Sequence, residues 1–192
     1  MNFLEKDLED IIFETDNDLL FEHGLFIDGQ KKRQVRIGNY GIADLITCSR
    51  RECDLHSVRI GNYGIADLIT CSRRECDLHS YPSTYLDITV FELKKDILDN
   101  NAFFQAIKYA RGIQSYLEYR KIENYTINIT LIGKELNLHD DFIYIPSLIH
   151  SEYIFKQLAS FNIYTYSYEF DGIQFEKQYD YVLKNNGWEG VR

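Results

Sequence analysis

The segment VFELKK, residues 90–95, places a carboxylate at Glu92 and an amine at Lys94, two positions apart. The run around it is rich in β-branched and aromatic residues, so we expect a strand, in which these two side chains project from one face. The backbone carbonyl of Leu93 lies between them. A carboxylate and a carbonyl are hard oxygen ligands suited to Mg²⁺ or Mn²⁺, and a lysine beside such a metal can orient water or stabilise charge on a phosphate. Taken alone, the pair is also typical of a solvated strand face.

A second carboxylate occurs in the segment GIADLIT, where an aspartate interrupts an otherwise apolar strand. A buried aspartate without a partner is costly, so such a residue usually has a function or lies at a strand end. The segment is present twice, which makes Asp44 and Asp67 equivalent candidates. If this strand neighbours the strand of Glu92, one aspartate and Glu92 can bind a single metal ion, as in metal-assisted hydrolysis of a phosphodiester.

The duplicated unit is VRIGNYGIADLITCSRRECDLHS, which fills residues 35–57 and, without one change, residues 58–80. Two identical copies favour one in-frame duplication inside a domain, since repeat architectures normally have three or more degenerate units. Each copy predicts a β-hairpin with GNYG as its turn. We favour Asp44 over Asp67, because using the first copy leaves the preceding segment LFIDGQKKRQ joined to its strand. A hybrid of the two copies remains open. We expect the spare hairpin to pair at a sheet edge or with a second chain, as a homodimer.

Two predicted helices carry further polar candidates. The apolar residues of segment 3–14 recur at helical spacing, and Glu5 precedes one of them, Leu8, by one turn. Glu5 is either an outer metal ligand that leans over the sheet edge or a plain surface residue. Segment 100–120 predicts the longest helix, in which Gln105 and Tyr109 share one face. They belong either to the same site or to a wet helix face.

The remaining segments complete an α/β pattern. We expect a turn over 16–24, strands over 85–95 and 125–133, a short helix over 151–161, and a terminal hairpin of strands 162–170 and 173–179 joined by Asp-Gly. The chain therefore predicts a single domain over residues 1–192, with a mixed central sheet flanked by helices. Residues 134–192 would form its C-terminal helix and hairpin extension.

In this order, the segments resemble the PD-(D/E)xK nuclease superfamily, and most closely its RecB-like and NucS-type branches. The matching stretches are EKDLEDII, GIADLIT, VFELKK and QAIKY, which together span roughly residues 3–133. The resemblance implies a restriction-endonuclease-like core of helix, three antiparallel strands, helix and strand (αβββαβ). It also implies Mg²⁺-dependent cleavage of DNA, in repair or in defence against foreign DNA.

The same resemblance implies roles for individual residues. The aspartate (Asp44 or Asp67) and Glu92 would be metal ligands, Lys94 would be catalytic, and Gln105 and Tyr109 would help hold the site and the phosphate. The proline that often precedes the family's aspartate is absent here, and the duplication supplies two aspartates where one is needed. The alternative is a nucleic-acid-binding module on a nuclease-like fold, catalytically impaired by the extra copy. A protein-interaction domain that uses the tyrosine-rich terminal hairpin is a third reading.

Charge and composition restrict the partners. The net charge of −9 argues against a protein coated in nucleic acid, but basic residues cluster at 31–33, 50–51, 73–74 and 94–95, where DNA phosphates could be bound. We expect a cytoplasmic protein with DNA as its partner and no membrane contact, since no apolar run approaches the roughly 20 residues of a membrane helix. The four cysteines, with Cys-x4-Cys spacing in each copy, predict free thiols rather than a zinc site.

Overall fold

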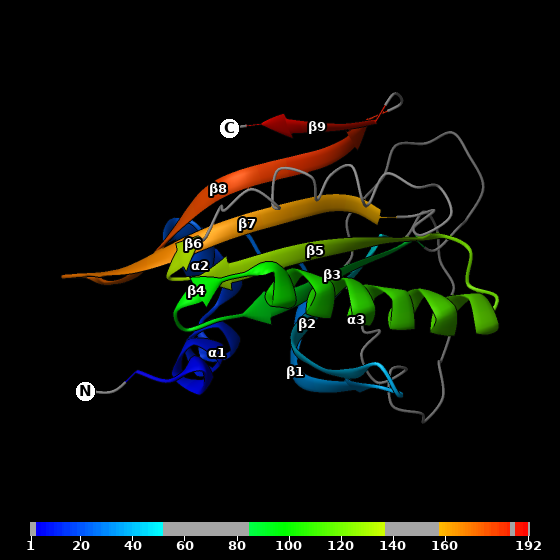
Figure 1. Cartoon of the computed structure of the whole chain (residues 1–192), viewed down its shortest axis with the longest axis horizontal. Helices are drawn as coiled ribbons and strands as arrows, with labels where there is room; N and C mark the ends of the chain where they lie inside the picture. Colours follow the sequence, from blue (N-terminus) through cyan, green and yellow to red (C-terminus); the bar gives the residue numbers. More distant parts are fainter. Residues whose placement is uncertain (1–2, 52–84, 137–157, 185–186, 192) are drawn as a thin grey trace.

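The computed structural model describes residues 3–51, 85–136, 158–184 and 187–191. Within them, seven strands form one sheet, and α3 lies across the front of this sheet in Figure 1. The helices are α1 (Glu5–Glu14), α2 (Asn17–Glu22) and α3 (Asn100–Tyr119). The strands of the sheet, in spatial order, are β1 (Gln30–Ile37), β2 (Gly41–Arg51), β3 (Tyr85–Leu93), β5 (Tyr125–Gly133), β7 (Leu158–Glu169), β8 (Gly172–Lys184) and β9 (Gly187–Val191).

The sheet is mixed. Strands β1, β2 and β3 pair antiparallel, β3, β5 and β7 pair parallel, and β7, β8 and β9 pair antiparallel again. A second, short parallel pair joins β4 (Ile97–Leu98) to β6 (Glu135–Leu136). The prediction of an α/β fold with a mixed sheet flanked by helices is confirmed.

Helix α3 covers one face of the sheet because its apolar residues recur every three or four positions. Its buried side chains include Phe103, Ala106, Ala110, Ile113 and Leu117, which pack with Ile88, Val90, Ile127 and Ile129 of β3 and β5. The helix begins after Asp99, whose side chain accepts a hydrogen bond from the Ala102 N–H at 3.0 Å. This cap satisfies one of the free N–H groups at the helix start.

Helices α1 and α2 cover part of the opposite face. Leu8, Ile12 and Leu20 are fully buried there and belong to the same apolar cluster as Phe91 and Leu93 of β3. The expected turn over 16–24 is wrong in part, because Asn17–Glu22 form a helical turn and a half. Asp16 caps it by accepting a hydrogen bond from the Asp18 N–H at 2.9 Å. None of the helices in the described part of the chain has the length and apolar character that a membrane crossing requires.

Two predictions near the C-terminus are corrected. The helix expected over 151–161 is wrong for residues 158–161, which begin strand β7, while 151–157 lie outside the described residues. Phe161 is buried opposite Ile129 of β5, so pairing with the sheet overrides the helical pattern. The terminal hairpin is present as β7 and β8, but its two-residue turn is Phe170-Asp171, and Gly172 at φ 129° already begins β8.

The predicted hairpin over the first copy is present as β1 and β2, and its turn docks closely on α3. A methyl group added at Gly112 of α3 would lie 2.6 Å from Ile37 Cγ2 and 2.7 Å from Tyr40 Cδ2. One added at Gly41 would lie 2.8 Å from Tyr109 Cε1. The GNYG turn and α3 therefore meet through two glycines, which bring the hairpin and the helix closer than any other residue allows.

This contact predicts an inverted effect of alanine in a helix. Gly→Ala in a helix interior ordinarily stabilises by about 0.5–1 kcal/mol, whereas Gly112→Ala should lower the free energy of unfolding by about 1–3 kcal/mol because the added methyl overpacks the contact. Ser115→Ala on the same helix is the control and should be neutral or stabilising. Urea denaturation of the three proteins measures the difference. A stabilised Gly112→Ala protein would show that the hairpin does not rest on α3.

Candidate active site

Strand register makes Asp44 and Glu92 neighbours. The pairing of β2 with β3 includes Ile46 opposite Val90 and Leu45 opposite Phe91, and Asp44 and Glu92 are the next residues of the two strands. Ile46 and Val90 both belong to the apolar cluster under α3. Because side chains alternate along a strand, Asp44 and Glu92 project from that same face. Asp67 lies outside the described residues.

Asp44 is half-buried and tied to the backbone of the neighbouring strand. Its Oδ2 accepts a hydrogen bond from the Leu93 N–H at 2.9 Å. Burial raises the pKa of Asp44 to about 6, although this hydrogen bond and the positive charge of Lys94 act in the opposite direction. This hydrogen bond holds the Asp44 carboxylate beside the carboxyl end of β3.

Glu92 is buried, with 1% of its side chain exposed. Its Oε1 accepts a hydrogen bond from Lys94 Nζ at 2.7 Å, whereas Oε2 is buried with no hydrogen-bond partner among the described residues. Burial, followed by the charge of Asp44, raises the pKa of Glu92 to about 7 despite the contact with Lys94. An acceptor oxygen left without a donor inside a protein needs an explanation, and a bound cation is one.

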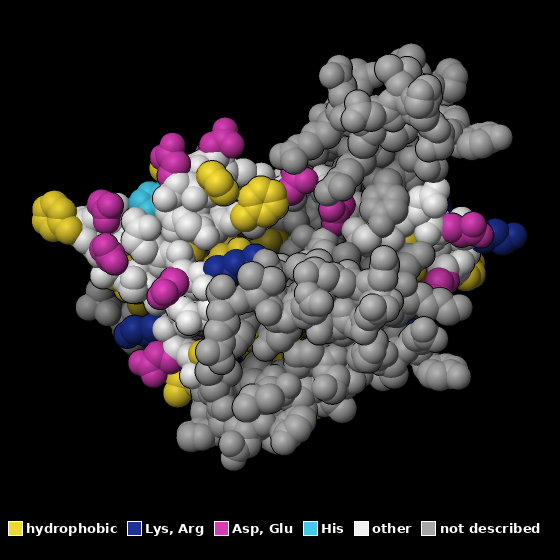
Figure 2. All heavy atoms as spheres, turned by 90° about the horizontal axis from the view of Figure 1, so that it is seen from above, with side chains coloured by type: hydrophobic (Ala, Val, Ile, Leu, Met, Phe, Trp, Pro, Cys, Tyr) yellow, Lys and Arg dark blue, Asp and Glu magenta, His cyan; other side chains and the backbone are white. Residues whose placement is uncertain are grey.

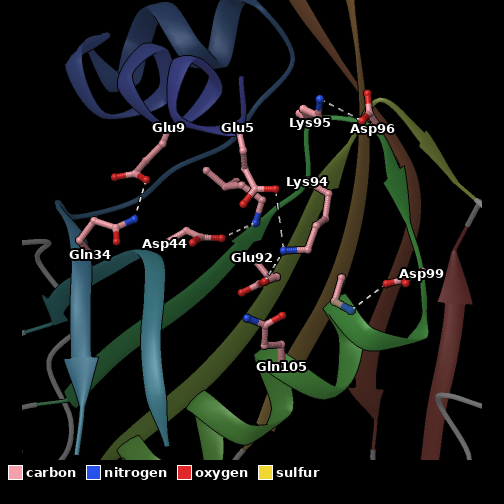
Figure 3. Close-up of polar contacts among 12 residues, drawn as sticks. Glu5, Glu9, Gln34, Asp44, Glu92, Lys94, Lys95, Asp96, Asp99 and Gln105 are labelled. Carbon is pink, nitrogen blue, oxygen red and sulfur yellow. Dashed lines mark hydrogen bonds and ion pairs between the residues drawn. The ribbon is translucent and has the colours of Figure 1, made fainter. Parts of the chain in front are cut away.

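Lys94 connects this carboxylate to helix α1. Its ammonium lies 2.7 Å from Glu92 Oε1 and 3.9 Å from Glu5 Oε2, and Figure 3 shows it between the two. Burial would lower the pKa of Lys94, but the hydrogen bond from its ammonium to Glu92 and the surrounding carboxylates raise it above the ordinary value. The expected placement of Glu92 and Lys94 on one face is confirmed. Glu5 reaches the site through Lys94.

Gln105 and Tyr109 interact with each other on α3. The Gln105 side-chain amide donates to the Tyr109 hydroxyl at 3.0 Å. Tyr109 is buried and packs against Gly41, so it is not on a wet helix face, whereas Gln105 is exposed. In Figure 3 the amide of Gln105 points toward Glu92. The tyrosine therefore holds the glutamine at the border of the site.

Sequence reasoning missed two residues beside Asp44. Glu9 of α1 is buried and accepts a hydrogen bond from Gln34 Nε2 at 2.7 Å, and both lie close to Asp44 in Figure 3. Gln34 has φ 53°, and β1 pairs with β2 on either side of it, at Arg33 and Val35. Glu9 follows Glu5 by one helical turn, a spacing that could have pointed to it. Nothing in the sequence marks the backbone conformation of Gln34.

The oxygen ligands fit a hard divalent cation. Asp44 and Glu92 offer adjacent carboxylates, and the Leu93 carbonyl belongs to the residue between Glu92 and Lys94. In the described ranges, no group of three or more His, Cys, Asp or Glu side chains has metal-ligand geometry. Mg²⁺ is commonly held by one or two carboxylates, with water and phosphate oxygens as its other ligands. Cys48 is buried, and the other three cysteines lie outside the described residues.

Comparison of the chain with protein-family models, with curated proteins and with solved structures gives no match. The assignment of a function therefore rests on the site.

The carboxylate pair predicts that stability falls as the pH rises. Between the ordinary carboxyl pKa and about 7, the folded chain keeps protons that the unfolded chain has released, so the free energy of unfolding decreases through this window. Glu92→Gln fixes the neutral form. Without divalent metal, this variant should melt several degrees above the wild type at pH 8 and close to it at pH 5.

The exposed Glu14 at the end of α1 offers a matched control. Glu14→Gln should follow the wild-type melting curve at both pH values. If wild type and Glu92→Gln lose stability equally between pH 5 and pH 8, Glu92 is not the group that retains a proton in the folded chain.

Proposed function

We propose that this chain is a metal-dependent nuclease that hydrolyses phosphodiester bonds of DNA, in repair or in defence against foreign DNA. The observation that carries the proposal is the buried Glu92 Oε2 beside Asp44 and Lys94, which has no hydrogen-bond partner in the part of the chain that the structure describes. Two neighbouring carboxylates with raised pKa values oppose folding near neutral pH, and a divalent cation would offset that repulsion.

Asp44, Glu92 and the Leu93 carbonyl are the proposed ligands. When bound there, Mg²⁺ or Mn²⁺ would polarise a phosphate oxygen and make water a better nucleophile at neutral pH. The chain's own part is to orient both carboxylates and to favour their charged forms against the effect of burial. The Leu93 N–H does this for Asp44, and the Lys94 ammonium does it for Glu92.

Lys94 is the proposed catalytic residue. Its raised pKa keeps the ammonium protonated at neutral pH. An ammonium has three donors, of which Glu92 takes one, so the others can bind a phosphate oxygen or orient a water. The side chain is 25% exposed, which leaves it within reach of a substrate. Glu5 lies on the outer side of Lys94, and Gln105 borders the site with an amide that can hold a phosphate.

The order of the elements supports the resemblance to PD-(D/E)xK nucleases. Helix α1 is followed, after the short α2, by the antiparallel strands β1, β2 and β3. After the short β4 come α3 and then β5, which is parallel to β3. The resemblance implies this succession for a restriction-endonuclease-like core. The site lies at the carboxyl ends of β3 and β5, which is where open α/β sheets commonly bind ligands.

Charge restricts the path of DNA. Among the described residues on the face shown in Figure 2, acidic side chains outnumber basic ones. In the basic segment 31–33, Lys31 donates to backbone carbonyls of Ile12 and Thr15, and Arg33 pairs with Asp10. These two therefore hold α1 on β1. Lys108, exposed on α3 one turn after Gln105, is better placed to meet a phosphate near the site.

Cleavage of plasmid and single-stranded DNA with Mg²⁺, Mn²⁺ or EDTA tests the proposal. Lys94→Met should lower the cleavage rate by about 100-fold or more, because charge stabilisation in the transition state is lost. Lys6→Met is the matched control, since Lys6 is exposed on α1 and outside the basic clusters, and it should retain full activity. Mn²⁺ should raise the melting temperature of Lys94→Met but not that of Glu92→Ala.

These two readouts separate catalysis from binding. A wild type that binds DNA and Mn²⁺ but never cleaves would instead support the impaired binding module. Full cleavage by Glu92→Ala would rule out the site.

A second pair of variants identifies the working copy. The structure brings Asp44 to Glu92, so Asp44→Asn should abolish Mn²⁺-dependent cleavage, while Asp67→Asn retains it. The opposite result would assign the site to the second copy. Partial activity in each single variant, with none in the double variant, would mean that the copies exchange.

A further inference from the structure

The sheet face opposite α3 changes character part-way along its strands. Toward the carboxyl ends of β3 and β5, Phe91, Leu93 and Ile132 pack in the cluster formed with α1 and α2. Parallel strands covered on both faces ordinarily read as continuous apolar runs. Toward the amino ends, this face is instead polar over four adjacent strands, at Ser49, Asp87, Thr89, Asn128, Thr130, Ser160 and Asn162.

These polar side chains form the floor of a pocket of about 220 Å³. Phe26 and Asp28, from the segment between α2 and β1, line it together with Phe91 and Tyr164. The volume corresponds to roughly seven waters of the bulk liquid. It lies below the usual range for drug-sized ligands, so the pocket suits a compact molecule. Since Phe91 and Glu92 are successive residues of β3, the pocket and the candidate active site lie on opposite faces of the sheet.

A chain of hydrogen bonds fixes the floor. Thr126 Oγ1 and Asn128 Nδ2 both donate to Asp87 Oδ1, at 2.9 and 2.5 Å. Ser160 Oγ donates to Asn128 Oδ1 at 2.7 Å. The side chains of β3, β5 and β7 therefore hold one another in place before any ligand arrives. Such preorganisation lowers the entropic cost of binding.

The lining defines the chemistry that it accepts. Asp28 and Asp87 are the charged residues among the described lining residues, and both are acidic, so a phosphate or carboxylate would meet like charge. Hydroxyl and amide groups supply both donors and acceptors, as a ligand with several hydroxyl groups requires. The aromatic rings of Phe26, Phe91 and Tyr164 offer apolar surface for the carbon face of a ring.

We infer that this pocket binds an uncharged polyhydroxylated molecule, a sugar that is either free or the ribose of a nucleoside. Neighbouring hydroxyl groups would donate to Asp87 or Asp28, as ribose hydroxyls do to the acidic residue of dinucleotide-binding folds. The hydroxyl and amide groups of the floor would hold the remaining oxygens. This inference does not depend on nuclease activity, because none of the pocket residues belongs to the proposed active site.

Titration calorimetry on the full chain tests the inference with adenosine, D-ribose, D-glucose and AMP as probes. At least one of the three uncharged probes should bind at concentrations up to about 10 mM, and AMP should bind more weakly than adenosine. Adenosine alone would indicate a nucleoside, and ribose or glucose a free sugar. No binding by any uncharged probe, or AMP bound as tightly as adenosine, would overturn the inference.

Variants locate the binding. Asp87→Asn should lower the affinity for the bound probe by about tenfold or more, the usual effect of losing a hydrogen bond to a charged group. Thr89→Val removes a lining hydroxyl with little change of shape and should also weaken it. Asp171→Asn, at the exposed β7–β8 turn, is the matched control and should bind as the wild type does. Unchanged affinity in both pocket variants would place the ligand elsewhere.

Discussion

The hydrogen bond from the Leu93 N–H to Asp44 and the register of β2 against β3 that produces it are the constraint on which the site depends. Side chains alternate with a period of two, so a slip by one residue would turn Asp44 to the opposite face and away from Glu92. A second contact also holds the hairpin in this register. This second contact lies at the same end of β2, where the GNYG turn, which ends three residues before Asp44, rests on α3 through Gly41 and Gly112. The hairpin is therefore fixed by a sheet contact and a helix contact at once.

The cost of this arrangement is electrostatic. Asp44 and Glu92 are brought together where burial disfavours their charged forms, and Glu9 and Glu5 add further negative charge nearby. The Lys94 ammonium offsets part of the repulsion, and its removal alone would leave the buried Glu92 carboxylate without a positive partner. Two large apolar clusters, one on each face of the sheet, stabilise the domain and offset this electrostatic cost.

The sequence is sufficient for features that depend on local periodicity. The alternation around Glu92 and Lys94, the hairpin of β1 and β2, and the apolar stripe of α3 are all visible in it, and the structure shows them. Features that depend on distant partners were missed. Residues 158–161 carry a helical pattern but become strand because β5 offers a parallel edge. Glu9 and Gln34 acquire their positions only when α1 packs on β1, and the family resemblance gave no signal for either.

Gln34 also has a consequence for the sheet as a whole. Among the described strands β1 forms one edge, and edges with regular, unpaired backbone groups invite strands from other molecules. The left-handed conformation of Gln34, at φ 53°, interrupts the regular spacing of N–H and C=O groups in the middle of this strand, and Lys31, Lys32 and Arg33 place charge beside the interruption. A foreign strand cannot form a continuous ladder along β1. The residue that supports Glu9 near the site thereby protects the protein from edge-to-edge aggregation.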